Sequence, residues 1–195
     1  VGCAIGTSDT TYTITGDIDA EVGILGIAFT AGADNNNLTL FGNISTEDAH
    51  GISLQGADFN TINMTGNIST VDAGLLLSNS NRNTINLTGN MTTTGNFASA
   101  LVLSTSNRNT INLTGNISTT GTDNAVGLRL IESNSNTITI NGDIITSGTG
   151  GASEPILLNG SDSNTFILSG AIHSLGNDQA IAVNATSQNN TFTFK

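Results

Sequence analysis

The sequence predicts an all-β fold, a single-stranded right-handed parallel β-helix, or β-solenoid, with about seven to eight coils and two to three short strands per coil. Three observations support this: a repeat of about 26 residues, a strict alternation of apolar and polar residues within each repeat, and a composition poor in helix formers. The chain has 195 residues, including 27 Asn, 30 Thr and 23 Gly, with only 10% charged residues. Asn, Thr and Gly have low helix propensity, so a helical bundle is excluded.

The repeat is anchored on a glycine. The segment 111–117, INLTGNI, recurs as INLTGNM at 85–91 and as INMTGNI at 62–68. The spacing between successive anchor glycines varies from 23 to 28 residues, which places the insertions in turns. We interpret residues 1–195 as one β-solenoid domain with repeats anchored at Gly16, Gly42, Gly66, Gly89, Gly115, Gly142 and Gly170.

Each repeat contains alternating segments that predict strands. Ile111 and Leu113 fall on one parity, whereas Asn112 and Thr114 fall on the other, and a period of two is typical of a strand with one buried face. A second apolar patch follows about ten residues later, as at 100–103. We therefore expect one strand before the glycine, one through it and one at the second patch. The right-handed sense follows from the usual chirality of parallel crossovers.

An asparagine lies two residues before the first apolar position of each first strand. Stacked coils would bring these amides about 4.8 Å apart, a spacing at which each side chain can donate to the next. We expect a structural asparagine ladder at a corner, although asparagine is also common in ordinary turns. The residues are Asn36, Asn60, Asn83, Asn109, Asn136, Asn164 and Asn190.

The outward face of the first strand carries short, uncharged, hydrogen-bonding side chains. Three interpretations remain open: an ice-binding face, an adhesive surface for glycans or neighbouring proteins, and an ordinary solvated strand, because Thr is common in strands. The residues are Thr61, Asn63, Thr65, Thr84, Asn86, Thr88, Thr110, Asn112 and Thr114.

The candidates for catalysis and metal binding are few. His50 and His173 follow no ligand spacing and are expected to be surface polar residues. Asp48 and Asp72 share an offset from their glycines and could hold calcium between two coils. The next coil has Gly95 instead of an acid at the equivalent position, so we expect Asp48 and Asp72 to be solvated turn residues. With one tyrosine and no tryptophan, the chain also lacks the aromatic platforms of sugar-processing sites, and we expect no enzyme, no metal and no cofactor.

Charge and cysteine content exclude several classes. Fifteen acidic residues against four basic ones give a net charge of -11, which excludes a nucleic-acid partner. The apolar runs are too short for a transmembrane helix, so no membrane insertion is expected. Cys3 is the only cysteine and cannot form an intramolecular disulfide. Arg82 and Arg108 recur in SNRNT and should be neighbours at an outer corner, either as solvated turn residues or as a small anion site.

The pattern NTINLTGNI, followed by A-x-G-L-x-L and S-N-x-N, resembles the repeat regions of bacterial autotransporter passenger domains and related surface adhesins. The resemblance extends from Tyr12 to Phe194. It implies a secreted, surface-displayed β-solenoid, but passengers of this kind include adhesins, stalks and enzymes alike. Residues 1–195 contain no counterpart of the membrane-barrel segment of the full-length family, so we expect either a piece excised from a longer protein or a free-standing secreted subunit.

The terminal segments predict self-association. Residues 1–5 align with the second apolar patch of a repeat, and Lys195 falls where the next anchor glycine would come, without an evident cap. Uncapped coils are open β edges. We expect copies to stack head to tail into an extracellular filament or adhesin stalk, with host or environmental surfaces as further partners; alternatively, a longer polypeptide continues the coil. The expected stacking residues are Val1, Ile5, Phe192 and Phe194.

Overall fold

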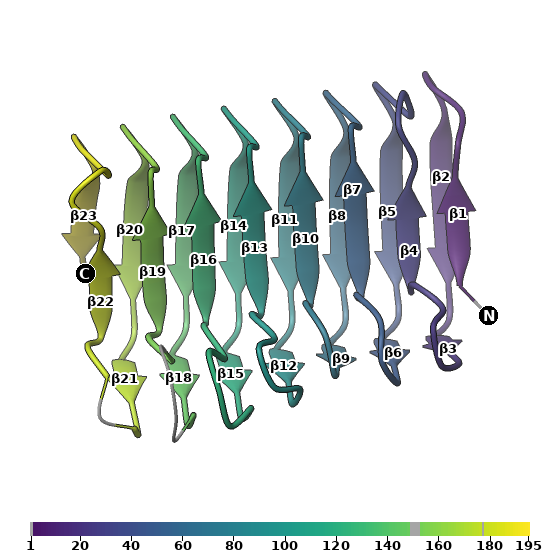
Figure 1. Ribbon diagram of the computed structural model, residues 1–195. Coiled ribbons are helices and arrows are strands. Elements are labelled where there is room, and N and C mark those ends of the chain that lie inside the picture. The colour runs from purple at the N-terminus through teal and green to yellow at the C-terminus, as the bar shows by residue number, and fades with distance from the viewer. Residues whose placement is uncertain (1, 149–152, 177) are drawn as a thin grey trace.

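The computed structural model describes residues 2–148, 153–176 and 178–195, which form three parallel sheets and no helix (Figure 1). Sheet A contains β1 (Cys3–Ile5), β4 (Ile27–Phe29), β7 (Ile52–Gln55), β10 (Leu75–Ser78), β13 (Leu101–Ser104), β16 (Leu128–Ile131), β19 (Ile156–Asn159) and β22 (Ile181–Val183). Sheet B contains β2 (Thr11–Thr15), β5 (Asn37–Phe41), β8 (Thr61–Thr65), β11 (Thr84–Thr88), β14 (Thr110–Thr114), β17 (Thr137–Asn141), β20 (Thr165–Ser169) and β23 (Thr191–Phe194). Sheet C contains β3 (Ile18–Ala20), β6 (Ile44–Thr46), β9 (Ile68–Thr70), β12 (Met91–Thr93), β15 (Ile117–Thr119), β18 (Ile144–Thr146) and β21 (Ile172–Ser174).

The chain visits sheets A, B and C in turn, which confirms the predicted all-β solenoid. Seven successive triplets of strands form full coils, and β22 and β23 belong to an eighth. In Figure 1 the chain rises through sheet A at the front and descends through sheet B behind as it advances, so the winding is right-handed. Among the described residues we find no helical segment with the length and hydropathy of a membrane span.

Like residues stack over like residues along the axis. Ile62, Ile85, Ile111 and Ile138 lie in one file of sheet B through consecutive parallel pairings. All four are at most 2% exposed. A single repeat cannot bury its apolar face alone, so the core exists only because neighbouring coils cover one another.

The anchor glycine makes the corner between sheets B and C and is not part of a strand, so the expected strand through the glycine is wrong. Gly115, for example, lies between β14 and β15 with a φ of 141°, a region that side chains rarely occupy. A Cβ atom there would lie 2.2 Å from the carbonyl oxygen of Gly89 in the preceding coil. The corner is therefore closed to any larger residue.

Inward threonines of sheet C tie the following turns to the core. Their hydroxyl groups donate to a carbonyl oxygen three to seven residues later in three cases and two residues later in one. One fixed anchor thus serves turns of different length, which is how the repeat accommodates its varying spacing. The donor and acceptor pairs are Thr46–Ala49, Thr70–Asp72, Thr119–Ala125 and Thr146–Ser153.

Candidate functional site

The seven asparagines of the expected ladder lie in one file, each immediately before a strand of sheet B. We call this file the buried ladder: Asn36, Asn60, Asn83, Asn109, Asn136, Asn164 and Asn190. The first six are at most 1% exposed. The strands begin one residue earlier than the apolar alternation indicated, because threonine opens most of them.

Asn109 shows how completely each member of the buried ladder is hydrogen bonded. Its backbone N–H donates to Oδ1 of Asn136 at 2.8 Å, and its own Oδ1 accepts from the backbone N–H of Asn83 at 2.8 Å. Its Nδ2 donates to the carbonyl oxygen of Ser80 at 2.9 Å and to Oδ1 of Asn136 at 3.2 Å. The side chain must therefore both donate and accept, which an amide can do.

A second file at the glycine corner runs in the opposite sense, and the sequence analysis did not identify it. Here the backbone N–H of each coil donates to the side-chain oxygen of the coil before, as from Asn116 to Asn90 at 2.8 Å. We call it the exposed ladder; five of its members are exposed and Asp143 is half-buried. Its members are Asp17, Asn43, Asn67, Asn90, Asn116 and Asp143.

The outward Thr and Asn residues of β8, β11 and β14 lie in register on sheet B, with Thr61, Thr84 and Thr110 in one file. In the central file the side-chain amide of Asn86 donates to Asn63 at 2.8 Å, and that of Asn112 donates to Asn86 at 2.9 Å. These contacts fix the central amides at the coil spacing. The result is a regular row of hydroxyl groups beside a row of hydrogen-bonded amides.

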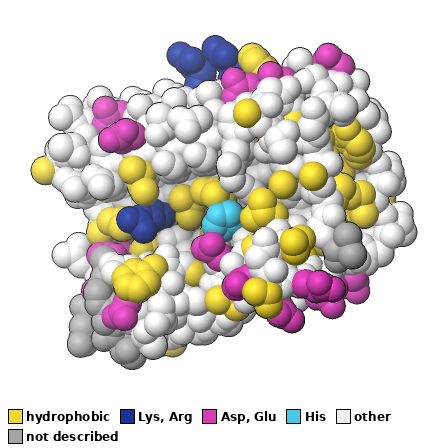
Figure 2. Space-filling model, turned by 45° about the vertical axis from the view of Figure 1, so that its right-hand side comes forward, with side chains coloured by type: hydrophobic (Ala, Val, Ile, Leu, Met, Phe, Trp, Pro, Cys, Tyr) yellow, Lys and Arg dark blue, Asp and Glu magenta, His cyan; other side chains and the backbone are white. Residues whose placement is uncertain are grey.

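Sheet A presents a different outward face, which the sequence analysis also missed. Its central file is Ala28, Ser53, Leu76, Val102, Arg129 and Leu157, in register from β4 to β19. Figure 2 views this side obliquely and shows hydrophobic side chains along it. Where the file has the small side chains of Ala28 and Ser53, the surface has a hollow of about 200 Å³. It is lined by Leu25, Ala28, Phe29, Thr30, Ala31, Ser53 and Gln55. The runs of three apolar residues in the second patch, as in 75–77, could have revealed this face.

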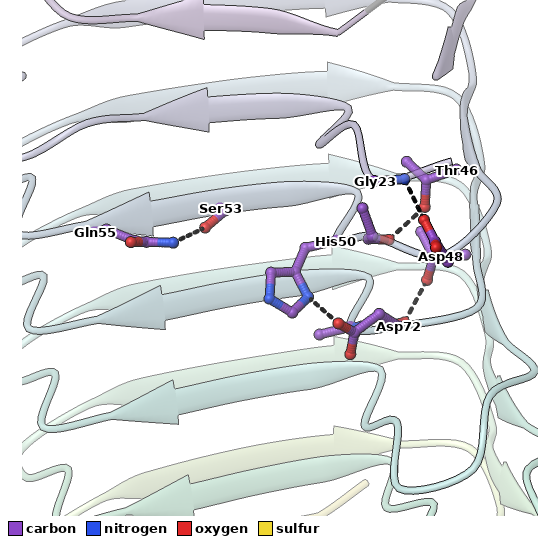
Figure 3. A network of polar contacts seen from close by, with 10 residues as sticks. Gly23, Thr46, Asp48, His50, Ser53, Gln55 and Asp72 are labelled. Carbon is purple, nitrogen blue, oxygen red and sulfur yellow. Dashed lines mark hydrogen bonds and ion pairs between the residues drawn. The ribbon is translucent and has the colours of Figure 1, made fainter. Parts of the chain in front are cut away.

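The two acids considered for calcium have different partners. Asp48 accepts a hydrogen bond from the backbone N–H of Gly23, whereas Asp72 lies 3.1 Å from Nδ1 of His50 (Figure 3). In Figure 3 the two carboxylates lie on neighbouring coils and contact different groups. No group of three or more His, Cys, Asp or Glu side chains that could hold a metal ion occurs among the described residues. His173 is exposed on β21, and Cys3 is half-buried with a free thiol.

Arg82 and Arg108 lie on adjacent coils in the turns between sheets A and B. The guanidinium carbon of Arg82 is 5.2 Å from the centroid of the Phe59 ring. Figure 2 shows basic side chains projecting together from the upper edge of the molecule, where these turns lie. Both arginines are exposed.

The expected stacking residues have different environments. Val1 lies outside the described residues, and Ile5 is only 1% exposed because the coil containing β4 covers it. Phe192 stacks on Phe166 with ring centroids 4.6 Å apart. Phe194 is 61% exposed, although its file partner Leu168 is 3% exposed. Phe194 therefore occupies a position whose equivalent in the preceding coil is buried.

In comparisons with family models, curated proteins and solved structures, no match to the chain was found.

Proposed function

We propose that the chain is a non-enzymatic structural rod of an extracellular filament or adhesin stalk, and that copies of it lengthen the rod by stacking coil upon coil. The carrying observation is that neighbouring coils contact one another through the same types of interaction along the rod. Sheet pairing, glycine corner and ladders all recur from coil to coil. A further coil of the same sequence type can make the same contact.

The exposed side chains of the coil containing β22 and β23 support stacking. Val183 is 46% exposed, while Leu158, its partner in β19, is fully buried, and Phe194 is 61% exposed. Another coil would cover these residues as inner coils cover their equivalents. Unpaired strand edges are ready templates for such pairing, and a head-to-tail contact of this type propagates without closing.

The extracellular location rests on the resemblance to autotransporter passengers and surface adhesins. The large negative charge is consistent with a polymer that stays soluble and avoids non-specific contacts between its sides, because like-charged rods repel one another. Association is then favoured only where strand edges and apolar residues meet.

Negative-stain electron microscopy and sedimentation velocity of the intact chain test the proposal. We expect rods of constant width whose lengths are multiples of one subunit, roughly 35 Å at 4.8 Å per coil. Phe194→Asp should abolish the long rods, since it places a charge in the stacking surface. Thr88→Asp adds the same charge to an exposed side position and should leave them intact. Single subunits at every concentration, with the original chain, would overturn the proposal.

A second candidate is an ice- or glycan-binding module on the outward Thr/Asn face of sheet B. The observation that favours it is the Asn63–Asn86–Asn112 contact row, which fixes the spacing of the face. Thermal hysteresis and glycan-array assays test the two ligands. Thr84→Leu should reduce binding, whereas Thr92→Leu, on sheet C, should not. An original chain inactive in both assays would rule this candidate out.

A further inference from the structure

The residue that precedes each buried-ladder position, or Thr10 in the first coil, has a left-handed backbone. The φ values in this file are 57° to 60°, and its members are Asp9, Asn35, Phe59, Arg82, Arg108, Ser135, Ser163 and Asn189. Short polar side chains adopt this conformation most readily because they can hydrogen bond locally. Five members of the file are Asp, Asn or Ser, which suits the requirement.

The three exceptions, Phe59, Arg82 and Arg108, lie in consecutive coils. Bulky side chains are costly in this backbone region, and such strained residues are typical of binding and catalytic positions. The turns nevertheless hold them firmly: the backbone N–H of Arg82 donates to Asn107 O and that of Arg108 to Asn134 O, both at 3.0 Å. Phe59 further restrains Arg82 through the cation–π contact.

A neighbouring file of side chains, which we call the amide file, is uncharged in the coils of Arg82 and Arg108 and in the coil that follows them. In it the backbone N–H of each coil donates to the side-chain oxygen of the preceding coil, as from Asn107 to Asn81 at 2.9 Å. Amides occupy the coils of Arg82, Arg108 and Ser135, and acids occupy the coils on both sides. In chain order the amide file is Asp34, Asp58, Asn81, Asn107, Asn134 and Asp162.

The two files enclose a polar groove of about 410 Å³. Left-handed positions and amides together line it, and the lining contains no acid: Asn81, Arg82, Asn107, Arg108, Asn134 and Ser135. Among the described residues, no carboxylate forms an ion pair with either arginine. Two of the four basic residues of a chain with net charge -11 thus line one groove without a counter-ion from the protein.

We propose that this groove binds one oxyanion group, a sulfate or a carboxylate, between the guanidinium groups of Arg82 and Arg108. Each guanidinium presents several N–H donors in a planar fork that matches a carboxylate or sulfate edge. The Ser135 hydroxyl and the side-chain amides border the same space and supply neutral donors for hydroxyl groups attached to the anion. An acidic monosaccharide unit has this combination of groups.

The surrounding charge limits the ligand to a single anionic group. Asp58 and Asp162 flank the three-coil window along the axis, and Glu132 is exposed in the turn that contains Ser135. An extended polyanion lying along the rod would meet these carboxylates and the net negative charge of the chain. A single sulfate or uronate residue bound within the three coils between Asp58 and Asp162 would not meet these carboxylates.

Nuclear magnetic resonance titration of the full chain tests the proposal through the side-chain N–H signals of Arg82 and Arg108. The probes are sodium sulfate, sodium acetate, glucose 6-sulfate and glucuronate, with chloride at equal ionic strength as the reference. We expect saturable shifts with oxyanions and none with chloride. Tighter binding of glucose 6-sulfate than of glucuronate indicates a sulfated ligand, and the reverse indicates a carboxylated one. Tighter binding of the two sugar derivatives than of sulfate and acetate indicates that the neutral donors take part.

Two variants separate binding from folding. Arg108→Asn should lower the affinity about tenfold, because it removes charge-assisted hydrogen bonds, while keeping the fold, because Asn tolerates the left-handed backbone. Ser163→Asn introduces the same residue in the same file outside the groove and should leave binding unchanged. Shifts that are equal with chloride, or an Arg108→Asn variant that folds and binds as the original does, would overturn the proposal.

Discussion

The buried ladder and the exposed ladder repeat at the same coil spacing but differ in composition. The buried ladder contains only Asn, whereas the exposed ladder has Asp at its first and last positions, Asp17 and Asp143. In the buried ladder most side chains donate to a carbonyl oxygen of the preceding coil, as Asn109 does to Ser80. In the exposed ladder the side chain must accept from a backbone N–H, and a carboxylate does that equally well.

Hydrogen-bond demand, in addition to turn propensity, therefore selects the residue at each corner. An ionised Asp cannot donate, so in the buried ladder it would face a carbonyl oxygen with no proton between them and no water to solvate the charge. At the exposed corner water reaches the second carboxylate oxygen. The amide file between sheets A and B follows the same rule, with Asp at 34, 58 and 162.

Asn109→Asp should have the largest effect on this comparison. The variant places a charge at a position that is 1% exposed and removes both donors of the side chain. We expect a loss of about 3–5 kcal/mol in the free energy of unfolding, the range for an uncompensated buried charge. Asn90→Asp, in the exposed ladder, should change it by less than about 0.5 kcal/mol. Chemical denaturation of both variants measures the difference, and equal losses would show that burial does not decide whether a corner accepts Asp.

Gly115→Ala tests whether the exposed corner is tolerant in its backbone as well as in its side chains. We expect a loss of about 3 kcal/mol, because the new Cβ atom would approach Gly89 O at 2.2 Å and the φ of 141° is strained for alanine. In Gly16→Ala the same type of corner has no heavy atom within 4 Å of the added carbon, so only backbone strain remains. In thermal unfolding, the Tm of Gly115→Ala should be well below the Tm of Gly16→Ala.

Asn109→Ala removes the buried amide without adding charge. It leaves the backbone N–H of Asn83 and the carbonyl of Ser80 without their partner, so we expect a loss of about 2–3 kcal/mol. Asn90→Ala should cost about 0.5–1 kcal/mol, since water can replace its exposed bond. Hydrogen exchange at the Asn83 amide would locate the loss: protection should fall there in the first variant and stay unchanged in the second.

Asp143→Asn should have the smallest effect, within about 0.5 kcal/mol. The N–H of Ala171 donates to the Asp143 carboxylate at 2.7 Å, and an amide oxygen can accept the same bond, while one negative charge is removed from a chain with net charge -11. Any small gain should disappear at high salt, which screens surface charges. Unfolding at two ionic strengths checks this, and a large loss would show that the carboxylate has a role beyond accepting a hydrogen bond.

Much of the fold could be predicted because the same alternating pattern recurs in successive repeats. The alternation in 62–68, 85–91 and 111–117 identifies the inward isoleucines, and one file of asparagines indicated the buried ladder. The strand through the glycine was wrong because alternation continues across Gly115 even though its backbone turns the corner. Parity alone cannot distinguish a corner from a strand.

The recurrence of SNRNT indicated that Arg82 and Arg108 are neighbours, but the exposed ladder and the full lining of the groove could not be found by looking for identical residues. The exposed ladder mixes Asn with Asp, so it is a file of acceptors and not of one residue type. The groove beside Arg108 depends on which side chains the turns between sheets A and B bring together, and on the left-handed backbone that they share. Neither property is visible in a repeat taken singly.

The opposite senses of the two ladders give each coil two chemically distinct faces. Toward later coils, the buried corner offers a backbone N–H and the exposed corner offers a side-chain oxygen; toward earlier coils the roles are exchanged. Two like faces brought together would set donor against donor at one corner and acceptor against acceptor at the other. A stack of these coils therefore has a directional polarity, and in any fibre built from it all subunits would have the same orientation along the axis.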